Sequence, residues 1–186
     1  MRNNKGITLV EILVVMVICG ILAGIAAPNL TNLIRKGRIE NQARQIYSDL
    51  TNTRIMAMNR NMMHFFRISG NSYKIYADTS NAGANFETYN AGDSQVLERG
   101  GPDTVPFTFT SARPVNESMG ADREVRFNAR GLVNQQGTIC VGGNNVVTQP
   151  QSNCVVFRTT KTRLGKIKIQ DIIDGNCDAD HCNEIQ

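Results

Sequence analysis

The sequence is poor in the residues that enzymes commonly use for catalysis. It contains only two histidines, His64 and His181. It also lacks the G-x-S-x-G motif of hydrolases, the H-E-x-x-H motif of zinc proteases and a phosphate-binding glycine loop. His64 lies beside Phe65 and Phe66, a context that favours a structural position on a strand over an acid–base role. The sequence therefore predicts no enzyme, no catalytic residue and no cofactor.

Positive charge is also absent from a long apolar run near the amino terminus. Residues 7–27 contain no lysine, arginine or histidine and only one acidic residue, Glu11. As a helix this run is about 31 Å long at about 1.5 Å per residue, which matches a bilayer hydrocarbon core of about 30 Å. A secretory signal peptide has a shorter apolar region, and a soluble core helix would show a polar face. The run therefore predicts a membrane-spanning helix.

Glu11 is the unusual residue of this helix. An acidic side chain in a membrane span costs free energy and is usually paired with a positive charge. Since the run itself has no basic side chain, the nearest partner at that depth is a new amino terminus made by proteolysis. In an assembly, the Glu11 carboxylate of one subunit can pair with such an amino group in its neighbour and fix the packing register. Gly20 and Gly24 have the small-xxx-small spacing that lets helices approach closely.

The amino terminus resembles the prepilin motif of type IV pilins and of the pseudopilins of type II secretion and competence systems. The sequence KGITLVE at residues 5–11 spans the end of a short basic leader and the start of the apolar run. The resemblance implies that a prepilin peptidase cuts between Gly6 and Ile7, and that the new amino group of Ile7 is N-methylated. It also implies that Glu11 supports assembly. Pro28 stands where many pilins carry a helix-perturbing proline.

The rest of the chain resembles the GspH/FimT-type minor pilins. The resemblance covers short stretches at residues 50–54, 57–61, 126–131, 137–140 and 154–158. The element Gly165-Lys166-Ile167-Lys168 stands where that group carries a G-R-x-R-like element, with lysines in place of arginines.

Some members of that group look like DNA receptors for natural transformation, which makes DNA a partner to consider here. The basic residues in question are Arg158, Lys161, Arg163, Lys166 and Lys168. The alternative is a solvated strand edge guarded by lysines. That alternative is favoured because aromatic stacking residues are absent and lysine lacks the bidentate fork of arginine. The net charge also falls from +4 to +2 when Arg2 and Lys5 leave with the leader.

Beyond Pro28 the chain keeps the apolar periodicity of a helix to about Asn59. A leader at 1–6, a span at 7–28 and an amphipathic stalk at 29–60 are therefore predicted, with a kink or an unwound stretch at Pro28. The core-facing stripe is expected at Leu33, Ile39, Ala43, Ile46, Tyr47, Leu50, Arg54 and Ala57.

Residues 61–186 read as a head of short strands separated by turns rich in glycine and asparagine. Residues 78–101 are predicted to form one loop or a pair of loops. The expected fold class is α+β, a long amino-terminal helix packed on an antiparallel sheet. The strands are predicted at residues 62–68, 72–77, 105–110, 124–127, 137–141, 154–159 and 166–170.

Four of the five cysteines lie in the head, and cysteines in an exported domain favour disulfides. Cys140, Cys154, Cys177 and Cys182 allow three pairings. The local pairs, Cys140 with Cys154 and Cys177 with Cys182, close the shortest loops and are the most economical. Cys19 lies in the apolar run.

The tail carries oxygen side chains at alternate positions, as calcium loops do. These residues are Asp174, Asn176, Asp178 and Asp180. Some secretion pseudopilins hold calcium in a late loop, but Ala179 stands where an EF-hand needs glycine. A solvated acidic turn without metal is therefore predicted.

Together these features predict a structural subunit, a minor pilin or a pseudopilin, in a type IV pilus-like filament. It would sit in the bacterial inner membrane with its head in the periplasm before assembly. The expected partners are the prepilin peptidase, other pilin or pseudopilin subunits and the membrane. The alternatives are a type II secretion pseudopilin, a DNA-binding minor pilin for DNA uptake, and a single-pass protein that never assembles.

We predict that the chain is cut between Gly6 and Ile7 and methylated at the new amino group. The intact mass of protein extracted from membranes of a cell that has the peptidase should correspond to a methylated chain starting at Ile7. The same protein made in a cell without the peptidase should keep its leader. A chain that starts at Met1 in both cells would contradict this prediction.

Overall fold

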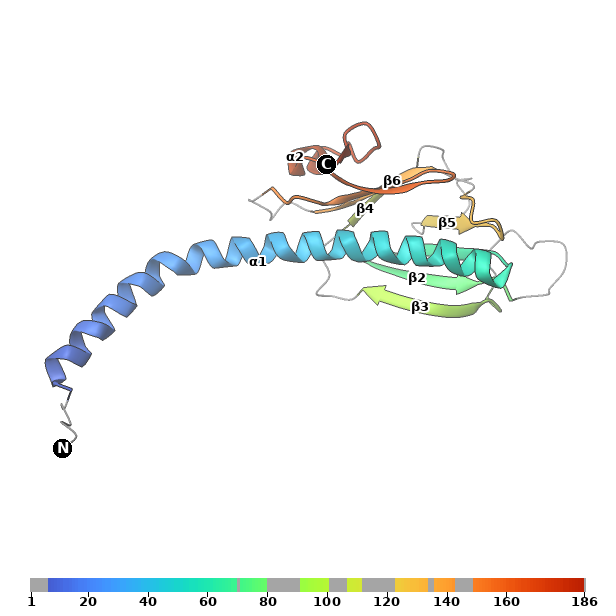
Figure 1. Ribbon diagram of the computed structural model, residues 1–186. Coiled ribbons are helices and arrows are strands. Elements are labelled where there is room, and N and C mark those ends of the chain that lie inside the picture. The colour runs from blue at the N-terminus through green and yellow to red at the C-terminus, as the bar shows by residue number, and fades with distance from the viewer. Residues whose placement is uncertain are drawn as a thin grey trace.

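The head and its helix form one α+β unit (Figure 1). The computed structural model describes residues 7–69, 71–79, 91–100, 107–111, 123–133, 136–142 and 149–185, with the main chain alone at 25–29, 107–111 and 123. A long helix projects from a head built on two antiparallel sheets. The expected α+β class is therefore confirmed.

Helix α1 spans Leu9–Arg60 without a break. At its start, the Thr8 hydroxyl oxygen accepts a hydrogen bond from the backbone N–H of Glu11 at 3.3 Å. At its end, Asn61 has a φ of 51°, the left-handed conformation that asparagine tolerates better than most residues. The helix continues through Pro28, so the perturbation expected there is a bend rather than an unwound stretch (Figure 1).

The second half of α1 is held to the head by one stripe of side chains. The stripe repeats every three or four residues, which places its members on one helix face. Leu33, predicted to begin the stripe, is 64% exposed, so the stripe begins later than expected. Thr53 fills one stripe position, and its buried hydroxyl donates to the Asp49 carbonyl oxygen at 2.6 Å. The apolar stripe residues, all at most 1% exposed, are Ile39, Ala43, Ile46, Leu50 and Ala57.

The first sheet has the order β3-β2-β1-β5 and is antiparallel throughout. Phe66 and Ile75 pair across it and belong to the core cluster that packs on α1. The prediction of a loop over 78–101 is wrong where β3 forms. This strand lies at the sheet edge and is largely exposed, so its sequence lacks the alternation that marks a half-buried strand. The strands are β1 His64–Ser69, β2 Ser72–Ala77, β3 Ser94–Gly100 and β5 Arg123–Phe127.

The second sheet has the order β4-β6-β7-β8-β9 and is also antiparallel. Strands predicted at 72–77 and 137–141 are confirmed with their bounds, and four others are found with ends shifted by at most two residues. The strands of this sheet are β4 Phe107–Ser111, β6 Gly137–Val141, β7 Cys154–Phe157, β8 Thr162–Lys166 and β9 Asn183–Glu184.

The strand predicted at 166–170 is wrong, because β8 ends at Lys166 and helix α2 follows at Ile169–Ile173. After Lys166, side chains make the backbone hydrogen bonds that a neighbouring strand would otherwise make. The Asn153 amide accepts from the Ile167 N–H at 2.8 Å and donates to the Ile167 carbonyl at 3.0 Å. The Gln149 side chain accepts from the Ile169 N–H at 3.1 Å. The chain can therefore leave the sheet without losing its backbone hydrogen bonds.

The second sheet is covered on both faces (Figure 1). Residues of β6 and β7 such as Ile139 and Val155 pack in the main core with α1. The opposite face, called here the outer face, is covered by α2 and the tail that follows it. This second apolar layer was not predicted from the sequence. Its buried members are Cys140, Cys154, Val156, Ile167, Ile172, Cys177 and Cys182.

A buried carboxylate ties the first sheet to α1. Asp49, only 6% exposed, accepts a hydrogen bond from the Tyr73 hydroxyl at 2.7 Å. Arg99 from the edge strand β3 approaches the same Asp49 oxygen at 3.5 Å. Burial, followed by the bond to Asp49, raises the pKa of Tyr73 far above its usual value, so the phenol stays protonated and donates. One α1 side chain thus holds both the second strand and the edge strand.

We predict that Asp49→Ala lowers the free energy of unfolding by about 2–4 kcal/mol, because it removes the buried carboxylate that accepts the hydrogen bond of the Tyr73 hydroxyl. Asp49→Asn should cost less, since an amide oxygen can still accept that bond. Glu98→Gln is the control because it removes an exposed ion pair with Lys74 on the same sheet and should change little. Thermal unfolding of the four proteins in one detergent measures this. Equal effects of Asp49→Ala and Glu98→Gln would contradict it.

Candidate functional site

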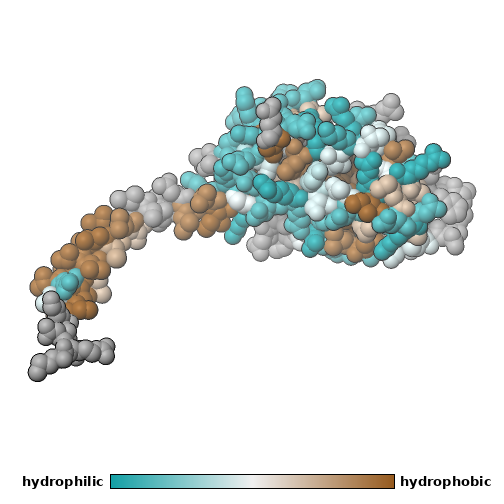
Figure 2. Space-filling model, in the orientation of Figure 1, coloured by the Kyte–Doolittle hydropathy of each residue, from teal (hydrophilic) through white to brown (hydrophobic). Residues whose placement is uncertain are grey.

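The first half of α1 carries a large apolar surface that the rest of the chain does not cover. Every large apolar side chain from Ile7 to Leu22 is at least 48% exposed. Figure 2 shows this hydrophobic surface running along the part of the helix that projects from the head. Exposed apolar surface of this extent marks an interaction site. The projecting helix is therefore the first candidate site.

Glu11 is the single acidic residue on this surface. It lies in the first turn of α1, where the helix dipole stabilises a negative charge. Its side chain is exposed, and its carboxylate has no hydrogen bond or ion pair within the described part of the chain. The carboxylate is therefore available to a partner outside the chain.

Gly20 and Gly24 lie on the same projecting helix. A Cβ added at either position would meet no other atom within 4 Å, so neither glycine is required by the packing of this chain. Their small size instead leaves room for a second helix. The predicted cleavage residue Gly6 lies outside the described residues, as does the side chain of Pro28. Among the residues described, no helix is both long enough and apolar enough to qualify as a membrane span.

The chain is an α+β head carried on a projecting apolar helix, which is a pilin-like fold. Residues 1–27 match the family of the prokaryotic N-terminal methylation motif, the signature of type IV pilins and pseudopilins. The chain thus joins this signature to a pilin-like fold. No curated protein and no solved structure matches the chain. The narrower resemblance to the GspH/FimT-type minor pilins stays a prediction.

All four head cysteines form disulfides, but the predicted pairing is wrong. The bonds join Cys140 to Cys177 and Cys154 to Cys182. Cys140 and Cys154 are direct neighbours across β6 and β7, and both face the tail. The argument from the shortest loops fails because α2 and the turn after it lay the tail over this face. Each bond therefore ties the tail to the sheet, and closing a loop of this length contributes about 3–4 kcal/mol.

Gly165 is needed where the second disulfide crosses β8. A Cβ on this residue would lie 2.6 Å from the Cys182 sulfur and 2.6 Å from the Asn183 carbonyl oxygen. The glycine of the Gly165-Lys166-Ile167-Lys168 element thus has a structural explanation in the packing of Cys154–Cys182. The sequence resemblance had raised DNA binding for the basic residues of this element, with a solvated strand edge as the favoured alternative.

The basic residues of the carboxyl-terminal region do not form one continuous stripe. Arg158, Lys161 and Arg163 line a concavity of about 230 Å³ on the outer face, together with Val156 and Glu184. Because side chains alternate along a strand, Lys166 lies on the other face of β8 from Arg163. Lys168 precedes the first residue of α2. The structure therefore brings three of the five predicted cations together and separates the other two.

The acidic tail folds around one of its own carboxylates. One oxygen of Asp178 accepts from the backbone N–H groups of Asp180 at 3.0 Å and His181 at 2.9 Å. The same oxygen lies 2.8 Å from Nδ1 of His181. The backbone bond from His181 is the main cause that lowers the pKa of Asp178, and the Asp178 carboxylate raises the pKa of His181. Asp178 thus organises this turn, and calcium binding in the tail is not proposed.

His64 is fully buried at the start of β1. Its Nδ1 lies 3.2 Å from the Met62 carbonyl oxygen. Burial lowers the pKa of His64, so the imidazole is neutral at neutral pH. Its Nε2 has no hydrogen-bond partner within the described part of the chain. These contacts agree with the structural position predicted from the sequence.

We predict that Gly165→Ala lowers the free energy of unfolding by about 1–3 kcal/mol, because the added methyl group overpacks the disulfide and the β8–β9 pair. The yield of the Cys154–Cys182 bond in non-reducing peptide maps should also fall. Lys166→Ala, at the next and exposed position, is the control and should form both bonds normally. Wild-type stability and full oxidation in Gly165→Ala would contradict the packing described here.

Proposed function

We propose that the chain is a non-catalytic structural subunit, a minor pilin or pseudopilin, of a type IV pilus-like filament. The prepilin peptidase removes residues 1–6, and residues 7–27 hold the mature chain in the inner membrane until assembly. The head then lies in the periplasm, where its disulfides form. The proposal includes no cofactor and no bound metal.

One observation carries this proposal: the methylation motif runs into the projecting part of α1, where the one acidic side chain, Glu11, is exposed and has no partner within the described part of the chain. In a filament, the Glu11 carboxylate of one subunit would pair with the methylated amino group of Ile7 in another. Either charge alone would be costly inside an apolar bundle, and the pair removes both costs. The pairing therefore selects one axial register between subunits.

The same helix suits both the membrane-anchored subunit and the subunit in a filament. Its apolar side chains would contact lipid before assembly and neighbouring helices afterwards, so transfer from one to the other changes the apolar contact area little. Gly20 and Gly24 then provide the close approach that favours helix contacts over lipid contacts. The head, whose core is closed by α1 and the two sheets, stays folded throughout.

We predict that Glu11→Ala leaves leader removal intact but lowers the share of the subunit in filaments at least about tenfold, because a buried positive charge loses its partner. Glu11→Gln should fail to a similar extent, since it keeps the shape and removes the charge. Sheared filament fractions and whole-cell fractions, probed for this chain, give the ratio.

Thr8→Ala is the matched control, because it removes the helix cap that contacts the Glu11 N–H and leaves the carboxylate in place. It should enter filaments nearly as well as the wild type. If Glu11→Gln also assembles at the wild-type level, the ion pair is not what selects the subunit, and the proposed assembly mechanism fails.

A further inference from the structure

The concavity on the outer face of the second sheet combines an apolar floor with an excess of positive charge. Val156, 1% exposed, lies at its base, and Arg158, Lys161 and Arg163 surround it. The single acidic group among its lining residues is Glu184. The lining therefore has three cations and one carboxylate, an excess of two positive charges.

We propose that this concavity is a binding site for a carboxylate side chain of an acidic peptide segment in a partner protein. The chain already places one carboxylate there, because Glu184 lies 3.7 Å from the Lys161 ammonium group. Both side chains of that pair are more than half exposed, so the contact is weak and readily exchanged. Glu184 thus marks the ligand chemistry that the site accepts and competes with an incoming carboxylate.

Arg158 is the cation of the site that is available to an incoming carboxylate. Its guanidinium has no hydrogen-bond or ion-pair partner within the described part of the chain. A planar guanidinium beside an ammonium group can hold a carboxylate through two parallel hydrogen bonds and an additional charge contact. Arg163 is already committed in part, because it donates to the Ala179 carbonyl oxygen at 3.0 Å.

The backbone around the site is held in place before any ligand arrives. Arg54 of α1 donates to the Thr160 carbonyl oxygen in the turn between β7 and β8, which positions Arg158 and Lys161 on either side of that turn. The Cys154–Cys182 disulfide holds the tail just before Glu184. A preformed site loses less conformational entropy on binding.

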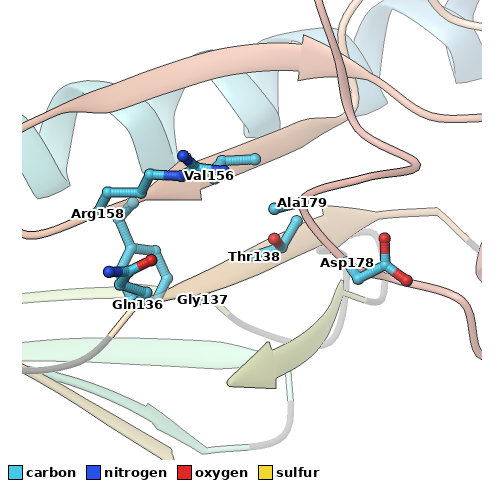
Figure 3. Close-up of a pocket in the computed structure, with 8 residues that line it drawn as sticks. Gln136, Gly137, Thr138, Val156, Arg158, Asp178 and Ala179 are labelled. Carbon is cyan, nitrogen blue, oxygen red and sulfur yellow. The ribbon is translucent and has the colours of Figure 1, made fainter. Parts of the chain in front are cut away.

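A second, smaller concavity adjoins the first and gives the peptide room to continue. Its volume is about 80 Å³, and it shares Val156 and Arg158 with the larger one. Figure 3 shows Arg158 and Asp178 on opposite sides of it, with Thr138 between them. The acidic Asp178 and the largely apolar lining would accept an apolar or basic side chain beside the bound carboxylate.

The arrangement fits an acidic peptide better than a nucleic acid. A phosphate backbone needs a row of cations along its path, and Lys166 lies on the opposite face of β8. Asp178 and Glu184 flank the concavity and would repel successive phosphates. No aromatic residue lines the larger concavity to stack on a base.

The test uses the full mature chain in detergent and fluorescence anisotropy of a labelled hexaglutamate peptide, with hexaglutamine and a short DNA duplex as competing probes. The double variant Arg158→Gln/Lys161→Gln should bind hexaglutamate at least tenfold more weakly than the wild type. Lys166→Gln, the control that removes one positive charge on the other face of β8, should bind within twofold of the wild type. Circular dichroism confirms that each variant is folded.

Glu184→Gln removes the internal competitor. This variant should therefore bind hexaglutamate about two- to fivefold more tightly than the wild type. Asp174→Asn, with the same charge change at the residue that follows α2, should have no such effect. Three results would overturn the proposal: no binding of hexaglutamate at millimolar concentration, equal losses in the double variant and in Lys166→Gln, or tighter binding of the DNA duplex than of the peptide. The inference concerns the head alone and does not depend on filament assembly.

Discussion

The whole structure depends on the packing of one helix face. The stripe from Ile39 to Ala57 fills the space between two sheets that share one core cluster, so neither sheet has a closed core without α1. The projecting half of the same helix exposes its large apolar side chains, and no other described element of the head covers them. A single unbroken helix thus joins the head to an interaction surface.

The second constraint is the covalent attachment of the tail. Both disulfides cross from the second sheet to the segment after α2, and they seal an apolar layer that would otherwise face solvent. Gly165 is the position where the sheet accommodates one of these bonds. Since the tail also supplies Glu184 and the Ala179 carbonyl to the basic concavity, oxidation of the head determines the shape of that site. The disulfides and the basic concavity are therefore linked through the same cysteines.

Strong local signals made the helix and several strands predictable. The stripe of α1 repeats at helical spacing, and β2 and β6 have apolar residues bounded by clear turns, so their bounds were correct. The edge strand β3 was missed because exposure removes its alternation. Residues 166–170 were misread because Asn153 and Gln149, distant in sequence, satisfy the backbone that a strand would have paired. The disulfide pairing required the position of α2, which no local pattern encodes.

The central claim is that the projecting half of α1 lies in an apolar environment while the head stays in water. Cys19 allows a direct measurement, since it is the only free cysteine among the described residues and lies exposed on that half. A nitroxide label on Cys19 of the full chain, reconstituted in lipid vesicles, can be probed by electron paramagnetic resonance with oxygen and with a water-soluble nickel chelate. The account predicts fast relaxation by oxygen and little relaxation by nickel. A label that nickel relaxes as strongly as it relaxes one on an exposed head position would contradict the account.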